Sequence, residues 1–95
     1  MKRYLLLHYG FVKPTPEIME AWEKWFGANT AKIVDGSRLP VGLELTASGT
    51  KDLPMTKNSI TGYTIIKAKN LVEAEKIARK CPIIASTRVY EILSK

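Results

Sequence analysis

A strand–helix–strand pattern that occurs twice is the strongest structural signal in this chain. Residues 3–9 (RYLLLHY) form an apolar run of strand type that stops at Gly10, and a helical pattern follows. Residues 60–67 (ITGYTIIK) are rich in β-branched and aromatic side chains and repeat the strand signal before a second helical pattern. Residues 87–93 (TRVYEIL) predict a last strand. Both faces of the first strand are mainly apolar, which places it in the centre of a sheet.

Each predicted helix has local start and stop signals. The first begins at Thr15-Pro16, because threonine is a good N-cap and proline is tolerated at the first helical position, and Gly27 predicts its end. The second begins after Asn70, with Glu73 placed as in a capping box, and stops at Pro82. Their apolar faces carry Ile18, Met19, Ala21, Trp22, Trp25 and Phe26 in the first, and Leu71, Ala74, Ile77, Ala78 and Cys81 in the second.

The middle of the chain gives weaker signals. Residues 31–36 (AKIVDG) predict a short strand that ends in an Asp35-Gly36 turn. Residues 41–47 (VGLELTA) alternate apolar with other side chains and predict an edge strand or one arm of a hairpin. The composition of residues 48–54 (SGTKDLP) predicts a loop.

The element order predicts an α+β protein with the ferredoxin-like split βαβ fold. The chain has 95 residues, which we expect to form a single domain spanning residues 1–95. Such a sheet has helices on one face only, and here the other face also carries apolar side chains, whichever parity the first strand adopts. An uncovered apolar face predicts a partner, so we expect a homodimer in which two sheets meet.

The net charge of +6 does not by itself indicate a nucleic-acid-binding protein. Residues 49–95 carry nine basic and four acidic side chains, so most of the excess lies in the second half of the chain. These positives are scattered, and the sequence contains neither an arginine-rich run nor a basic stripe interleaved with aromatic residues. We therefore interpret the charge as a solvated basic surface and do not expect nucleic acid as a partner.

Cysteine usage and motif absence exclude several kinds of site. Cys81 is the only cysteine, so an intramolecular disulfide and a multi-cysteine metal cluster are excluded. Its place at the end of a helix disfavours a thiolate, and we expect a buried structural residue. A free cysteine suits a reducing compartment, and no segment approaches the about 20 apolar residues that span a bilayer, so we expect a cytoplasmic protein without membrane contact. No catalytic triad, phosphate loop or dinucleotide fingerprint is present, and we expect no cofactor.

His8, the only histidine, lies near the end of the first strand on the same face as Tyr4 and Leu6. It is either a hydrogen-bonded packing residue or, if its face lines a cavity, the natural acid or base of the protein. At most Asp35 or Asp52 could join it as a metal ligand, which is too few for a zinc site, so we expect no metal.

The remaining candidates each have a structural and a functional interpretation. Trp22 and Trp25 either pack the core or form the wall of a pocket with a polar occupant. Asp35 belongs to a turn or faces the mouth of a cleft, and Tyr63, beside Gly62, presents its hydroxyl to the cavity or packs under a helix. The ligand-binding candidates are therefore His8, Trp22, Trp25, Asp35 and Tyr63, with His8 and Asp35 as the acid–base candidates.

Several segments resemble the YCII-related family, and more narrowly its DGPF-like branch. The resemblance covers nearly the whole chain, and its most specific pieces are Ser59-Ile60-Thr61-Gly62-Tyr63, Cys81-Pro82 and Val89-Tyr90-Glu91. It implies a dimeric α+β barrel. One branch of the family is similar in shape to muconolactone isomerase, has relatives that dehydrochlorinate aromatic-derived compounds, and is thought to use a His–Asp pair.

The chemistry of the family does not transfer to this chain. The first helix contains no histidine, and the residue before Pro82 is Cys81 instead of aspartate, so the His–Asp pair is absent. The Asp-Gly-Pro-Phe signature is also absent, since residues 50–54 read TKDLP. Whether the protein is an enzyme therefore stays open at this point.

Three functions remain. The first is a dimeric α+β barrel that binds a small cyclic or aromatic-derived molecule between helices and sheet, with or without proton transfer of the isomerase or lyase kind. The alternative is a non-catalytic interaction or accessory module that acts through its dimer surface. Nucleic-acid binding, which rests on the charge alone, ranks last.

Overall fold

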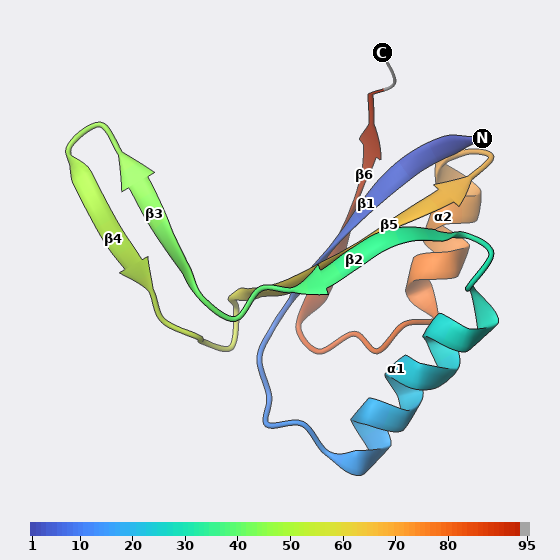
Figure 1. Ribbon diagram of the computed structural model, residues 1–95, viewed down its shortest axis with the longest axis horizontal. Helices are drawn as coiled ribbons and strands as arrows, with labels where there is room; N and C mark the ends of the chain where they lie inside the picture. The colour runs from blue at the N-terminus through green and yellow to red at the C-terminus, as the bar shows by residue number, and fades with distance from the viewer. Residues whose placement is uncertain (94–95) are drawn as a thin grey trace.

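The computed structural model describes residues 1–93, in which two helices cover one face of a four-stranded sheet (Figure 1). The elements follow in the order β1 (Lys2–Tyr9), α1 (Pro16–Ala28), β2 (Ile33–Arg38), β3 (Gly42–Thr46), β4 (Gly49–Leu53), β5 (Ile60–Ala68), α2 (Leu71–Arg79) and β6 (Ser86–Ile92).

The four-stranded sheet is antiparallel, with strand order β2-β5-β1-β6. β1 is therefore central, as its two apolar faces predicted. The strand order and the two helices on one face confirm the ferredoxin-like α+β fold.

The core lies between the sheet and α2, with Tyr4, Leu6 and Ile66 fully buried. α2 packs directly on the sheet, whereas α1 stands farther from it (Figure 1) and enters the core mainly through Trp25. The Trp25 indole Nε1 donates a hydrogen bond to the carbonyl oxygen of Ile77 at 2.9 Å, which ties α1 to α2. Because this tie lies in the C-terminal half of α1, space remains between its N-terminal half and the sheet.

Both helix starts agree with the sequence prediction. The Thr15 hydroxyl oxygen accepts a hydrogen bond from the Ile18 amide at 3.2 Å, and the Asn70 side-chain oxygen accepts one from the Glu73 amide at 2.9 Å. Each bond satisfies a backbone N–H that has no partner within its helix.

The predicted loop at residues 48–54 is wrong. Residues Gly49–Leu53 form β4, which pairs with β3 in a hairpin that stands away from the rest of the molecule (Figure 1). Glu44 lies opposite Lys51 in this pair, so opposite charges face each other across the strands. Neither face of β4 packs on the core, so its sequence needs no apolar alternation, and its composition indicated a loop. We call residues 42–53 the arm.

The predicted turn at Asp35-Gly36 is also wrong, because β2 continues to Arg38. The register shifts between Ile33 and Asp35, which marks a β-bulge. A Cβ atom at position 36 would lie 3.0 Å from the carbonyl oxygen of Tyr63. Gly36 therefore permits a close approach of β2 to β5 and does not turn the chain.

The opposite face of the sheet, within the described residues, has no helix over it (Figure 1), and we call it the helix-free face. Its side chains are partly exposed and include Leu5, Leu7, Tyr9, Tyr63, Ile65 and Tyr90. Neither α1 nor α2 has the length and apolar character needed to cross a membrane.

Candidate functional site

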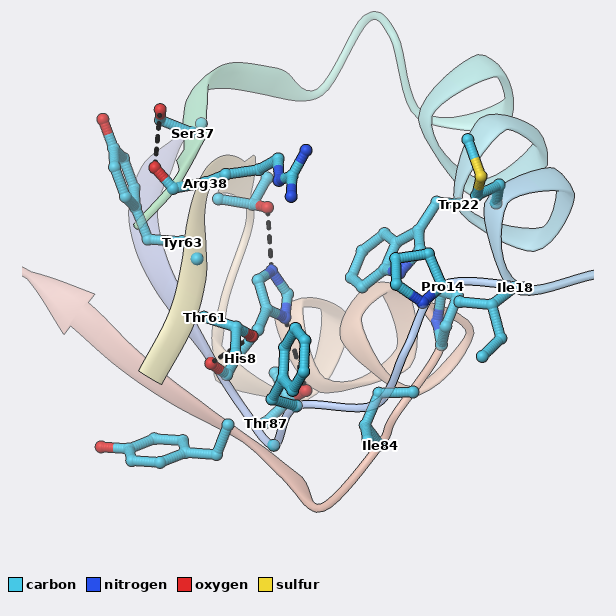
Figure 2. A pocket seen from close by; sticks show the side chains of 18 of the residues that line it. His8, Pro14, Ile18, Trp22, Ser37, Arg38, Thr61, Tyr63, Ile84 and Thr87 are labelled. Atoms are coloured by element: carbon cyan, nitrogen blue, oxygen red, sulfur yellow. Dashed lines mark hydrogen bonds between the residues drawn. The ribbon is translucent and has the colours of Figure 1, made fainter. Parts of the chain in front are cut away.

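A cavity of about 680 Å³ lies between α1 and the sheet (Figure 2). Its walls come from the end of β1 and the loop after it, the exposed turns of α1, the ends of β2 and β5, and the segment before β6. The lining is largely apolar and includes Phe11, Val12, Ile18, Met19, Trp22 and Phe26. A largely apolar cavity of this size with a few polar groups is typical of a small-molecule site.

Gly10 follows β1 directly and allows a close approach to the segment before β6. Its φ angle is +106°, and a Cβ atom there would lie 2.7 Å from Cβ of Ala85. Only glycine fits this position without strain, because other residues rarely adopt such a φ angle. The end of β1 therefore lies directly against the segment before β6, where the Ala85 amide donates a hydrogen bond to the Tyr9 carbonyl oxygen at 3.2 Å, and Phe11 and Val12, which follow Gly10, line the cavity.

His8 is the central polar group of the cavity, and its side chain is held from both sides. Its Nε2 shares a hydrogen bond of 2.9 Å with the Thr64 hydroxyl, and its Nδ1 lies 3.5 Å from the Thr87 hydroxyl (Figure 2). The Trp22 ring stands edge-on to the imidazole, with ring centroids 5.0 Å apart. Because each threonine hydroxyl can donate or accept, both neutral tautomers of His8 find partners.

The electrostatics of His8 follow from its burial. Only 8% of the residue is exposed, and desolvation lowers the pKa of its imidazole from 6.5 to about 4. The imidazole is therefore neutral at pH 7 and can both accept and donate a hydrogen bond.

Arg38 is the one cationic side chain among the described residues that line the cavity. Figure 2 shows it reaching past β5 to the side of the sheet where His8 lies. In the part of the chain that the structure describes, no carboxylate forms a salt bridge with it. Glu23 of α1 also borders the cavity.

Asp35 and Tyr63 border the cavity, but their polar groups bond to each other. The Tyr63 hydroxyl donates a hydrogen bond to the Asp35 carboxylate at 3.2 Å, and the other carboxylate oxygen accepts one from the Gly36 amide at 2.8 Å. The negative charge of Asp35 raises the pKa of Tyr63. Figure 2 shows Tyr63 on the opposite side of its strand from His8 and Trp22.

The structure thus brings two of the five candidate residues together inside the cavity, namely His8 and Trp22. Trp25 does not line it, because its indole is buried against α2. Thr64, Thr87 and Arg38 were not among the candidates. Thr87 lies directly opposite His8 in the sheet, and only knowledge of the strand register could have revealed it.

Cys81 is buried, as predicted, and burial raises the pKa of its thiol. Its sulfur lies 4.0 Å from the Thr87 hydroxyl. Within residues 1–93, no group of three or more histidine, cysteine, aspartate or glutamate side chains is placed to hold a metal ion.

Comparison with solved structures finds an enzyme that is similar to this chain over nearly its whole length. It is 5-chloro-2-hydroxyhydroquinone dehydrochlorinase from Burkholderia phenoliruptrix in complex with 2,5-dihydroxybenzoquinone, with a TM-score of 0.60 over 98% of this chain and 95% of that chain, at 14% identity. A likeness at this identity supports the fold alone. The 30S ribosomal protein S6 from Thermotoga maritima covers 96% of this chain and 87% of its own, at 17% identity and a TM-score of only 0.44. No protein-family model matches the sequence, and no curated protein sequence matches it significantly.

Proposed function

We propose that the protein binds a small, flat aromatic or quinone-like compound in this cavity and that His8 exchanges a proton with it. The observation that carries the proposal is a neutral, buried imidazole held between two threonine hydroxyls in a cavity whose walls are otherwise mainly apolar. Apolar walls favour the faces of a ring, and the polar groups fix the position of an oxygen substituent.

The aromatic side chains of α1 supply a surface for such a ring. Trp22 and Phe26 lie nearly parallel, with an interplanar angle of 27° and ring centroids 5.6 Å apart, and both border the cavity. Arg38 would balance a negative charge on an oxygen of the ligand, since a guanidinium binds oxyanions well. Trp25 has a supporting role in this proposal, because it fixes α1 in place.

The proposed proton transfer uses the low pKa of His8. An imidazole with a pKa of about 4 is a weak base toward water, but it can take a proton from an acidic hydroxyl on a quinone-like ring. The ligand O–H bond breaks, its electron pair stays on oxygen beside Arg38, and an N–H bond forms on His8. The Thr64 hydroxyl, 2.9 Å from Nε2, can pass this proton by accepting one hydrogen bond and donating another. We assign no step to Asp35, because its carboxylate is bonded to Tyr63 and Gly36.

The similar dehydrochlorinase supports the class of ligand in a coarse way. Its structure holds 2,5-dihydroxybenzoquinone, a flat ring with both hydroxyl and carbonyl oxygens.

We also propose that this chain is a YCII-related protein and a homodimer whose helix-free faces lie at the interface. The partly exposed apolar side chains Leu5, Leu7 and Ile65 support that interface.

The second candidate function is a non-catalytic module that acts through its dimer surface. The exposed apolar side chains of the arm favour it, because such a surface indicates an interaction with another protein.

Ligand titration tests the first proposal. We expect 2,5-dihydroxybenzoquinone to quench the fluorescence of Trp22 in a saturable way, with the signal lost in Trp22→Phe. Arg38→Met should weaken binding about tenfold, whereas the matched control Lys51→Met, which removes an exposed positive charge from the arm, should not. If no quinone, phenol or aromatic acid binds in a saturable way, the first proposal is wrong and the non-catalytic module remains.

Hydrogen exchange tests the chemistry. In the reverse direction we expect His8 to give this proton to a ring carbon, so that a C–H bond forms with the electron pair of the oxyanion and the oxygen becomes a carbonyl. Repetition of the two steps in D₂O exchanges the ring hydrogens of the bound compound, and His8→Gln should slow that exchange, followed by NMR, by about 100-fold. A His8→Gln variant that binds and exchanges like the wild type would restrict the protein to binding.

A further inference from the structure

The arm carries an apolar face that packs on nothing else in the described part of the chain. Leu43 is 55% exposed and Leu45 is 74% exposed, and both point to the same side because strand side chains alternate. Val41, which directly precedes the arm, is 88% exposed. β3 and β4 pack on each other, and the arm stands apart from both helices and the sheet (Figure 1). A two-stranded hairpin is marginally stable alone in water, so a surface that covers it would stabilise it.

The shape of the molecule also indicates a missing neighbour. Its radius of gyration is 14.4 Å, compared with about 12 Å for a compact domain of this length. In Figure 1 the arm and the four-stranded sheet diverge from a common base, and both helices lie on the side of the sheet that faces away from the arm. The arm therefore leans toward the side of the sheet that has no helices.

The charges on the two surfaces are complementary. On the helix-free face, Arg3 lies directly opposite Lys67, and like charges in this position repel each other. No side-chain carboxylate of residues 1–93 forms a salt bridge with either of them. On the arm, Asp52 lies opposite Leu43 and therefore shares its apolar face.

We infer that the apolar face of the arm packs on the helix-free face of a second copy of this chain, with Asp52 next to the partner's Arg3 and the partner's Lys67. The inference rests on the proposed homodimer and adds the arm to it. The arm leaves its own sheet at the end where β2 stops and β5 begins, and Arg3 and Lys67 lie at the other end. Two sheets that face each other in antiparallel fashion bring each arm over that far end, so a twofold axis makes the same contact twice.

The arm also connects this interface to the cavity. Pro40 and Met55, at its base, border the same cavity as His8 and Trp22. Docking of the arm would therefore fix one edge of the ligand site, so each subunit would depend on its partner for a well-formed cavity.

Sedimentation of arm variants tests the apolar contact. We expect Leu43→Asp to raise the dimer dissociation constant by about 30-fold or more, because a buried aliphatic contact becomes a buried charge. Val72→Asp is the matched control, since Val72 is exposed in the first turn of α2, on the other side of the sheet. It should leave the dissociation constant unchanged. Circular dichroism of each variant checks that the fold is retained.

A charge exchange tests the polar contact. Asp52→Lys should weaken the dimer about tenfold at low salt, and adding Lys67→Asp to the same chain should restore it, because each interface then has the opposite pair. The double variant Glu44→Lys/Lys51→Glu exchanges the pair on the other face of the arm, keeps the net charge, and should leave the dimer unchanged. Failure of Lys67→Asp to restore the dimer would overturn the proposed contact.

A third variant separates failure of this inference from failure of the homodimer. Tyr90 lies on the helix-free face, away from the arm, and is 48% exposed. If Tyr90→Asp breaks the dimer and the arm variants do not, the sheet interface stands and the arm contact is wrong. If the wild type is monomeric at micromolar concentration, both the homodimer and the arm contact are wrong.

Discussion

At the scale of single residues, the environment of His8 decides what the cavity can do. Its threonine partners come from the strands on either side, and the sequence offered no local signal for either of them. The helix caps Thr15 and Asn70 could be predicted because a cap bonds to a residue three positions away. Contacts between residues far apart in the chain depend on strand register, which local patterns do not specify.

The lowered pKa of His8 makes stability depend on pH. The folded protein keeps the imidazole neutral down to about pH 4, whereas the unfolded chain takes up a proton near pH 6.5. The unfolded state thus binds more protons between these values, so the contribution of His8 is fully present above pH 6.5 and is lost as the pH falls to 4. We expect a loss of about 2 kcal/mol, allowing for partial solvation. Urea unfolding of wild type and His8→Gln at pH 7, 5.5 and 4 measures this loss. If the free energy of unfolding changes equally with pH in the two proteins, the expectation is wrong.

Tyr4 offers a second test at this scale. Its side chain is fully buried, and its hydroxyl has no hydrogen-bond partner among residues 1–93. Burying a hydroxyl without a partner costs free energy, so Tyr4→Phe should raise the free energy of unfolding by about 1 kcal/mol. Tyr63→Phe, which removes an exposed hydroxyl, should change it by less than about 0.5 kcal/mol. Denaturant unfolding measures both. A destabilised Tyr4→Phe would mean that the hydroxyl is bonded in solution.

At the scale of elements, prediction succeeded where the sequence has an apolar periodicity, including the exposed strand β3, and failed where it has none. β1, β5 and both helices carry strong apolar patterns, because each buries one side. β4 buries neither side, so its polar sequence looked like a loop. In β2, Asp35-Gly36 has the composition of a turn but forms a bulge, since Gly36 allows close contact with β5.

The link from β1 to α1 depends on Gly10. Gly10→Ala would place a Cβ 2.7 Å from Ala85 in a backbone conformation that alanine avoids, and we expect it to lower the free energy of unfolding by about 2 kcal/mol or more. Gly27→Ala is the matched control, because Gly27 lies within α1 and a Cβ there meets no atom of the described residues within 4 Å. It should stabilise the protein by about 0.5–1 kcal/mol. Thermal unfolding compares the two. Similar effects of both substitutions would contradict the role assigned to Gly10.

At the scale of the whole molecule, folding gathers charges that are scattered in the sequence. Arg3, Lys67 and Arg88 come from three strands and share the helix-free face with three tyrosines. The Arg88 guanidinium lies over the ring of Tyr9, 4.8 Å from its centroid. Composition gave the net charge but not this arrangement, because the register of β1 with β5 and β6 creates it.

In the whole molecule, the base of the arm connects the proposed dimer interface to the proposed ligand site. If docking of the arm fixes Pro40 and Met55 at the edge of the cavity, the dimer binds ligand more tightly than the monomer, by about tenfold for a typical coupling. By linkage, a saturating ligand must then tighten the dimer by the square of that factor, about 100-fold, because each dimer holds two sites. Titrations of 2,5-dihydroxybenzoquinone at protein concentrations above and below the dimer dissociation constant measure the first effect, and sedimentation with and without the compound measures the second. The Tyr90→Asp monomer should bind with the weaker affinity at every concentration. Equal affinities for monomer and dimer would mean that the cavity is complete within one subunit.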